Sequence, residues 1–184
     1  MGVLDAALRC VARWGLTKTT LDDVAKEAGC SRATVYRAFP GGKDALFDAV
    51  GERELTTLFA AVADAVHAAA DLEDALVGAI TTVSARLQNH AALQFLLAHE
   101  PGLVLPQLAF HQLDALLARI RAFGAPLLAR FIADDDEAAR TVEWVARIVL
   151  SYLCTPAAGM QLTDDAAVRK LVRSFVLPGL LQPA

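Results

Sequence analysis

The chain has few cysteines, no long apolar run and no strand-like alternation, and each absence excludes a class of protein. Its 184 residues include three widely spaced cysteines, Cys10, Cys30 and Cys154, which make neither a disulfide framework nor a CxxC metal pair. No unbroken stretch of apolar residues is long enough to span a membrane, and Asp5 and Arg9 interrupt the start where a signal peptide needs an apolar segment. We therefore expect a protein of the reducing cytoplasm with no membrane partner.

A recognisable catalytic constellation is also missing. No nucleophile–base pair, pair of carboxylates or metal cluster converges at a known spacing. His90, His99 and His111, with Glu100, match no zinc motif. The segment 41–43, Gly-Gly-Lys, lacks both the GxxxxGK[ST] pattern and the preceding strand of a phosphate loop. We expect no enzyme activity, no metal and no cofactor.

Helix-forming apolar sequence is what the chain has in quantity, since 55% of its residues are hydrophobic. An opening helix with Leu4, Leu8 and Val11 on one face should close at Gly15. The fold class expected is all-α, with a three-helix head over residues 1–45 and a six-helix body over residues 46–184. The body helices expected are 43–69, 73–89, 91–99, 107–132, 135–155 and 164–177. The breaks expected between them are Pro101–Gly102, Pro106, an acidic helix cap at 134–137, Pro156, Gly159 and Pro178–Gly179.

Two short helices joined by a tight turn are predicted between Thr20 and Phe39. Thr20 with Asp23 predicts a capping box, and Gly29 suits the left-handed residue that ends a helix. Ser31 can cap the next helix only two residues later, which is the spacing of a helix-turn-helix. The residues expected to face inward are Leu21, Val24, Ala25 and Ala28 in the first helix, and Val35, Ala38 and Phe39 in the second.

The outer face expected for the second helix is small, polar and basic. From Ser31 to Lys43 there are three basic residues and no carboxylate, although the formal net charge of the chain is -4. Residues 1–50 carry seven Lys and Arg against six Asp and Glu, whereas the remainder carries ten against fifteen. This uneven charge favours contact between a polyanion and the head alone. A nine-residue helix, roughly 13 Å long, also matches a DNA major groove about 12 Å wide.

This segment resembles the TetR-type transcriptional regulators, whose DNA-binding half has the pattern TT..D.A..AG.S..T.Y..F followed by a Lys and a Leu. The resemblance covers about the first fifty residues. One departure is Ala38, where many members have a histidine that contacts phosphate. The other is the glycine pair 41–42, which lengthens the usual Phe-to-Lys spacing by one residue. The matching residues are Thr19, Thr20, Asp23, Ala25, Ala28, Gly29, Ser31, Thr34, Tyr36, Phe39, Lys43 and Leu46.

The resemblance implies a repressor that binds a palindromic double-stranded operator as a homodimer and is released by a small effector. It implies that residues 1–45 bind DNA and that residues 46–184 bind the effector and dimerise. Phosphate contacts would set the register, and base contacts would set the sequence preference. The DNA-binding residues implied are Thr20, Ser31, Arg32, Ala33, Thr34, Tyr36, Arg37 and Lys43, of which Thr20, Tyr36 and Lys43 would meet phosphates.

Two groups of apolar residues in the body exceed what a monomer core needs, and they match the implied roles in dimerisation and effector binding. The pair of helices near the C-terminus is apolar on more than one face, as a four-helix dimer interface requires, although part of it is ordinary core. The second group lies between Leu93 and Phe131 and suits a lipophilic or aromatic effector such as a fatty acyl chain. The interface residues expected are Val142, Val145, Ile148, Val149, Tyr152, Leu171 and Phe175. The pocket residues expected are Phe95, Leu96, His99, Leu103, Phe110, Leu113, Leu117 and Phe123.

Two other functions remain open on the sequence alone. One is a helical lipid carrier, or an enzyme, whose head does not bind DNA. The other is a head that serves as a protein-interaction module, against which the carboxylate-free basic face argues. Operator binding that weakens log-linearly with salt would separate the regulator from both.

Overall fold

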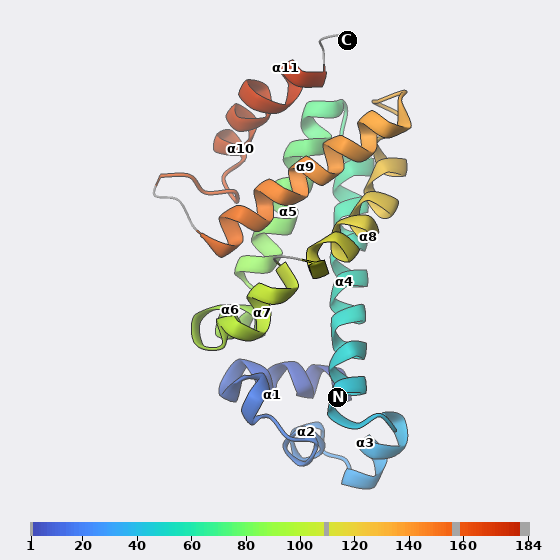
Figure 1. Ribbon diagram of the computed structural model, residues 1–184, viewed down its shortest axis with the longest axis vertical. Coiled ribbons are helices and arrows are strands. Elements are labelled where there is room, and N and C mark those ends of the chain that lie inside the picture. The colour runs from blue at the N-terminus through green and yellow to red at the C-terminus, as the bar shows by residue number, and fades with distance from the viewer. Residues whose placement is uncertain (1, 109–110, 156–158, 181–184) are drawn as a thin grey trace. The chain divides into compact units, whose positions relative to one another are not determined.

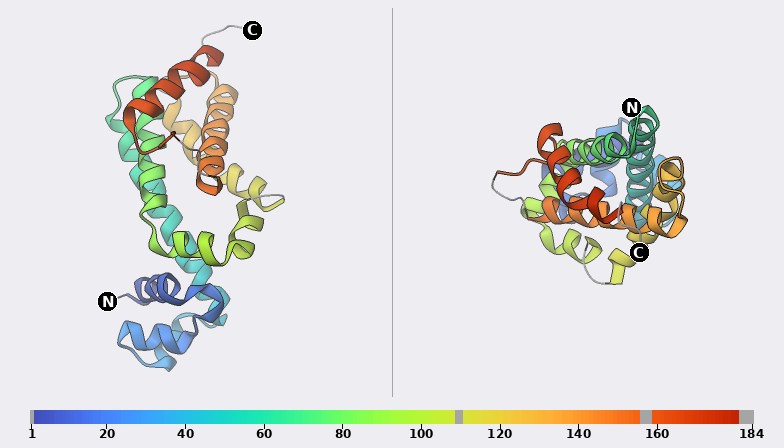
Figure 2. Two further views of the ribbon diagram at one scale, coloured as in Figure 1. Left: turned by 90° about the vertical axis from the view of Figure 1, so that its left-hand side faces the viewer. Right: turned by 90° about the horizontal axis from the view of Figure 1, so that it is seen from above.

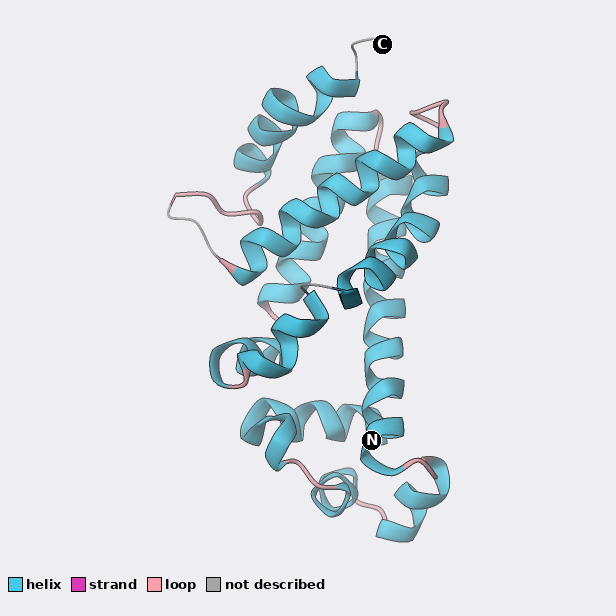
Figure 3. Ribbon diagram, viewed as in Figure 1, coloured by secondary structure: helices cyan, strands magenta, loops and turns pink. Residues whose placement is uncertain are grey.

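The computed structural model describes residues 2–108, 111–155 and 159–180, and within them every regular element is helical (Figure 3). The all-α fold class expected from the sequence is therefore confirmed. None of the helices in these ranges is both long and apolar enough to cross a membrane. The helices are α1 (Val3–Lys18), α2 (Leu21–Ala28), α3 (Arg32–Ala38), α4 (Gly42–Ala68), α5 (Leu72–Gln88), α6 (Ala91–His99), α7 (Pro101–Leu108), α8 (His111–Leu128), α9 (Asp135–Cys154), α10 (Asp165–Leu171), the π-helical segment η1 (Val172–Val176) and α11 (Leu177–Leu180).

The chain divides into two compact units, each built from two separate stretches of sequence (Figure 1). The head unit comprises Met1–Thr57 and Asn89–Leu105, and the body unit comprises Leu58–Gln88 and Pro106–Ala184. Helix α4 contributes its first part to the head unit and its last part to the body unit. Helix α6 packs against α1, so a segment distant in sequence belongs to the head.

The head core is formed by α1, α2, α3 and the start of α4. Val24, Val35 and Leu46 have no exposed surface at all, and Cys10 of α1 is equally buried. Burial raises the pKa of the Cys10 thiol, with a further contribution from the carboxylate of Glu27. The whole cluster is Ala6, Ala7, Cys10, Leu21, Val24, Ala25, Val35, Leu46 and Val50.

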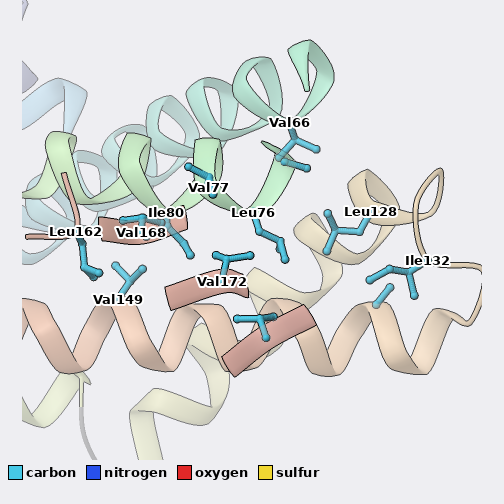
Figure 4. Close-up of a cluster of buried hydrophobic side chains, with 13 residues drawn as sticks. Val66, Leu76, Val77, Ile80, Leu128, Ile132, Val149, Leu162, Val168 and Val172 are labelled. Atoms are coloured by element: carbon cyan, nitrogen blue, oxygen red, sulfur yellow. The ribbon is translucent and has the colours of Figure 1, made fainter. Parts of the chain in front are cut away.

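The body core gathers on α5, which contacts α9, α10 and η1 (Figures 2 and 4). Ile80 of α5 is fully buried, and so are Val168 of α10 and Val172 of η1. Helices α8 and α9 pack closely where Gly124 meets Val142, because a Cβ atom at position 124 would lie 2.7 Å from Val142 Cγ1. The buried members are Val66, Ala75, Leu76, Val77, Ile80, Leu128, Ile132, Ala138, Val149, Leu162, Val168, Val172 and Val176.

The predicted interruption at residues 101–106 is wrong, because this segment forms α7. Pro101 occupies the first helical position, where its missing N–H is not needed and its fixed φ already suits a helix. The helix expected over 107–132 is also too long at its end, since α8 stops at Leu128. There the N–H of Phe131 donates to the Leu128 carbonyl over 2.8 Å and turns the chain.

The helix predicted over 164–177 continues through Pro178, where a break was expected, but changes its winding on the way. Val168, Val172 and Val176 are buried at intervals of four residues, and the wider π-helical turn of η1 keeps such positions on one side. The acidic cap predicted for α9 is confirmed, because Asp134 Oδ1 accepts the Glu137 N–H over 2.8 Å.

Candidate DNA-binding interface

Helix α2 begins with the capping box that its sequence predicts. The Asp23 N–H donates to Thr20 Oγ1 over 3.2 Å, and the Thr20 N–H donates back to Asp23 Oδ2 over 3.0 Å. The hydrogen bonds from Thr20, first from its side chain and then from its backbone, lower the pKa of the Asp23 carboxyl. The start of α2 is thus satisfied by its own residues.

The turn between α2 and α3 also matches the prediction. Gly29 ends α2 with φ of 69°, in the left-handed region that glycine adopts without strain. Ser31 then caps α3, since its Oγ accepts the Thr34 N–H over 3.1 Å. Two consecutive helices joined by the three residues Gly29, Cys30 and Ser31 form a helix-turn-helix.

Helix α3 anchors one side in the head core and leaves the other in solvent. Val35 is completely buried, and Phe39, which follows the helix, is half-buried. Ala38 was expected to face inward but is exposed, because α3 ends there and the next residue, Phe39, packs against the head core. The exposed residues of the helix-turn-helix include the predicted Thr20, Ser31, Arg32, Ala33, Tyr36 and Arg37, and Thr34 is half-buried.

Arg32 has partners within the head that the sequence did not reveal. Its Nε lies 2.9 Å from Asp22 Oδ1, and its Nη1 donates to Asp22 Oδ2 over 3.0 Å. Its Nη2 donates to Tyr36 Oη over 3.1 Å, and the guanidinium carbon lies 5.1 Å from the centre of the Tyr36 ring. Hydrogen bonding to Tyr36 and the charge of Asp22 raise the pKa of Arg32. To meet a base, Arg32 has to leave Asp22.

Arg37 differs from Arg32 in having an exposed side chain with no hydrogen bond or ion pair to any residue that the structure describes. It lies near the end of α3. A guanidinium without a partner inside the protein loses no intramolecular contact when it binds a phosphate or a guanine edge. Arg37 is therefore the basic residue of α3 best placed for an external anion.

Lys43 lies at the start of α4, and its ammonium group is hydrogen-bonded to backbone oxygens of α1. Its Nζ donates to the Leu16 carbonyl over 2.6 Å and to the Thr17 carbonyl over 3.3 Å. The predicted phosphate contact of Lys43 stays a prediction, but the ammonium already has two acceptors. These bonds join residues 27 and 26 positions apart and could not be read from local spacing.

The residues predicted for a dimer interface lie mainly in and around the body core. Val149 is buried in that core, whereas Phe175 of η1 is 72% exposed. Ile148 of α9 is half-buried. The others that pack against the core from partly buried positions are Val142, Val145, Tyr152 and Leu171.

The residues predicted for an effector pocket are divided between the two units. Phe95, Leu96, His99 and Leu103 belong to the head unit, and Phe95 stacks on His99 with ring centres 4.3 Å apart. In the body unit, Phe123 stacks on Phe59 at 4.1 Å, Leu117 is fully buried and Leu113 is half-buried. Phe110 lies outside the described residues. Within those residues no three metal-ligating side chains come together.

Comparison with known proteins places this geometry in a family. The family model described as bacterial regulatory proteins, tetR family, matches residues 3–50. The HTH-type transcriptional regulator Rv1255c of Mycobacterium tuberculosis is 30% identical over 187 residues, covering 99% of this chain and 85% of that protein. The head is thus the helix-turn-helix of a DNA-binding transcriptional regulator. The chain belongs to the TetR family.

Two solved structures are similar in fold over nearly the whole chain. The TetR family repressor AlkX from Dietzia sp. aligns with a TM-score of 0.68 and 22% identity, covering 98% of this chain and 95% of its own. The fatty acid degradation regulator FadR from Bacillus halodurans aligns with a TM-score of 0.65 and 16% identity, covering 95% and 97%. The all-helical plan is therefore shared beyond the DNA-binding segment.

Proposed function

We propose that this regulator represses transcription in the cytoplasm by binding a palindromic operator as a homodimer. The observation that carries the proposal is the exposed face of α3, where Arg37 has no hydrogen-bond or ion-pair partner among the described residues and no carboxylate lies between Ser31 and Lys43. Arg37 and Ala33 would read base edges in the major groove, with Arg on guanine or Ala on a thymine methyl. Thr20 and Tyr36 would hold phosphates on either side and set the register.

Arg32 and Thr34 complete the proposed base-reading surface, with Ser31 holding α3 in place as its cap. Arg32 would exchange Asp22 for DNA, so that Asp22 would discriminate against sequences that offer Arg32 no acceptor. Such a competing internal partner raises specificity at the expense of affinity. We leave Lys43 out of the phosphate contacts, because its ammonium has backbone acceptors in the head unit.

Selection of bound sequences from a random duplex pool tests the proposal. The chain should enrich a palindromic consensus, because two-fold protein symmetry imposes two-fold operator symmetry. Arg37→Ala should weaken binding to this consensus by about 1–3 kcal/mol, or roughly 5- to 150-fold, and should relax the base preference at one position in each half-site.

Arg86→Ala is the matched control, since Arg86 is an exposed arginine of α5 in the body unit. Its binding should equal that of the unmodified chain. Enrichment of a single half-site, together with a monomeric mass in solution at micromolar concentration, would contradict the homodimer. No enrichment even at low salt would favour the alternative of a lipid carrier or enzyme.

A small lipophilic or aromatic effector is proposed to release the operator. Support comes from the apolar side chains of α8 in the body unit, including the buried Leu117 and Phe123, which stacks on Phe59, and from fold relatives described as a fatty acid degradation regulator and a repressor implicated in n-alkane degradation. A panel of fatty acids and n-alkanes should contain at least one compound that weakens operator binding by about 10-fold or more. A compound that binds the protein and leaves operator affinity unchanged would count against this release mechanism.

A further inference from the structure

The last turn of α1 is interrupted in a way that creates a binding place for a carboxylate. Gly15 has φ of 83° and ψ of 168°, which is not helical, although the chain resumes a helical turn up to Lys18. The interruption removes the N–H groups of Leu16 and Thr17 from the hydrogen bonding of a continuous helix. Free N–H groups side by side favour an anion.

Glu100 fills this place with its side chain. The Leu16 N–H donates to Glu100 Oε2 over 2.7 Å, and the Thr17 N–H donates to Oε1 over 3.2 Å. A Cβ atom at position 15 would lie 2.8 Å from the carboxyl carbon of Glu100, so only glycine allows the approach. Burial raises the pKa of Glu100, but the hydrogen bonds from Thr17 and Leu16 and the charge of Lys43 outweigh it, and the net pKa is lowered.

The backbone of Glu100 is held on both sides because the residue lies alone between α6 and α7. Its own N–H donates to the Leu96 carbonyl over 2.8 Å, and its carbonyl accepts the Leu103 N–H over 3.0 Å. Both peptide groups of Glu100 are thus fixed by the neighbouring helices. The side chain therefore reaches α1 from a backbone position that α6 and α7 fix.

Lys43 binds the other side of the same short segment. The segment 15–17 offers its N–H groups to Glu100 and its carbonyls to Lys43. A carboxylate on the donors and an ammonium on the acceptors reinforce each other, because each charge favours the polarisation that the other induces. Charge-assisted hydrogen bonds of this kind are roughly twice as strong as neutral ones.

The contacts of Glu100 and Lys43 with residues 15–17 matter because this segment lies next to the helix-turn-helix. The helix-turn-helix begins directly after it, at the Thr20 cap of α2, and ends at Phe39, four residues before Lys43. Lys43 therefore ties the end of the helix-turn-helix to its beginning. Thr19 strengthens the beginning, since its buried Oγ1 donates to the Gly15 carbonyl over 2.6 Å. Glu100 connects both ends to α6 and α7.

We propose that Glu100 and Lys43 are positioning residues for DNA recognition, which act as a clamp on residues 15–17 and thereby fix how α2 and α3 are presented to the operator. The proposal rests on the operator-binding function proposed above. It assigns Lys43 an internal role instead of a phosphate contact. Glu100 touches no DNA and acts only through α1 and Lys43.

Operator binding by Glu100→Gln, Lys43→Gln and the double variant tests the clamp. Each single variant should bind about 10-fold more weakly, and the double variant should bind about as weakly as either one rather than 100-fold, because both remove the same clamp. The slope of log affinity against log salt should stay unchanged in all three, since no phosphate contact is lost. Asp48→Asn removes one negative charge from an exposed position of α4 in the head and should leave binding unchanged.

Several outcomes would overturn the proposal. A salt slope that falls by about one in Lys43→Gln, with normal binding by Glu100→Gln, would return Lys43 to a phosphate contact. Additive losses in the double variant would show two independent effects. If the unmodified chain selects no operator at all, the proposed function fails, and the clamp is then judged by hydrogen exchange alone.

Amide hydrogen exchange measures the clamp without DNA. In Glu100→Gln the amides of Leu16 and Thr17 should exchange at least about 10-fold faster, while those of the buried Val24 and Val35 keep their rates. Equal acceleration at Val24 and Val35 would mean that Glu100 only stabilises the head as a whole, which contradicts a positioning role.

Discussion

Replacing Leu46 by alanine should destabilise the head by about 2–5 kcal/mol and abolish operator binding at the temperature where the unmodified chain still binds. Leu46 is a large side chain with no exposed surface, packed where α1, α2, α3 and the start of α4 meet. Its truncation leaves a cavity that the packed helices around it can close only in part. Because α3 packs on the same core, its exposed face loses its support when the core opens.

The two tryptophans of the chain make this measurable. Trp14 belongs to the head unit and Trp144 to the body unit, so a Trp144→Phe chain reports head unfolding by fluorescence. Leu105→Ala is the matched control, because Leu105 lies in the same unit but is 42% exposed, and its truncation should cost less than about 0.5 kcal/mol. Equal losses in the two variants would refute a central role for Leu46.

Gly124→Ala should destabilise the body by about 1–3 kcal/mol, although alanine is the better helix former. The added Cβ would stand 2.7 Å from one methyl group of Val142 and 3.0 Å from the other. A β-branched side chain in a helix has one favoured rotamer, so Val142 cannot turn aside cheaply. The packing of α8 against α9 has to give way instead.

Gly78→Ala provides the control within the same unit. Its new Cβ would lie 3.6 Å from the nearest atom, an ordinary contact, so the variant should be unchanged or up to about 1 kcal/mol more stable. Unfolding followed through Trp144 in a Trp14→Phe chain compares the two. Adding Val142→Ala should restore part of the loss in Gly124→Ala, and the absence of any recovery would place the strain elsewhere.

Local signals predicted the helix-turn-helix almost completely. Thr20 and Asp23 are three residues apart, Gly29 needs only its own backbone freedom, and Ser31 caps the helix that follows it. Interactions between residues two to four positions apart can be predicted from spacing, because the local backbone conformation alone brings such residues together. The prediction at Pro101 failed because local sequence is ambiguous there. Proline is common both after the end of a helix and at its first position, and Pro101 begins α7.

The internal partners of the site were not predictable in the same way. Asp22 binds Arg32 across ten residues, and Glu100 reaches Leu16 across 84. An aspartate in the first turn of α2 reads as a favourable helix start, and a glutamate before a proline reads as a loop. Only packing brings these charges together, so the sequence suggests which residues are basic but not which of them are already bound.

The contact between Lys43 and the end of α1 also bears on how such proteins can be re-engineered. Residues 18–42 form an excursion of the chain whose two ends stay within reach of one lysine side chain. Because the two ends of this segment lie close together, another segment with the same distance between its ends can replace it without displacing α1 or α4. We therefore expect that a transplanted segment of this span with a different α3 brings its own operator preference, provided that it keeps the buried residues Leu21, Val24, Ala25 and Val35 of the head core.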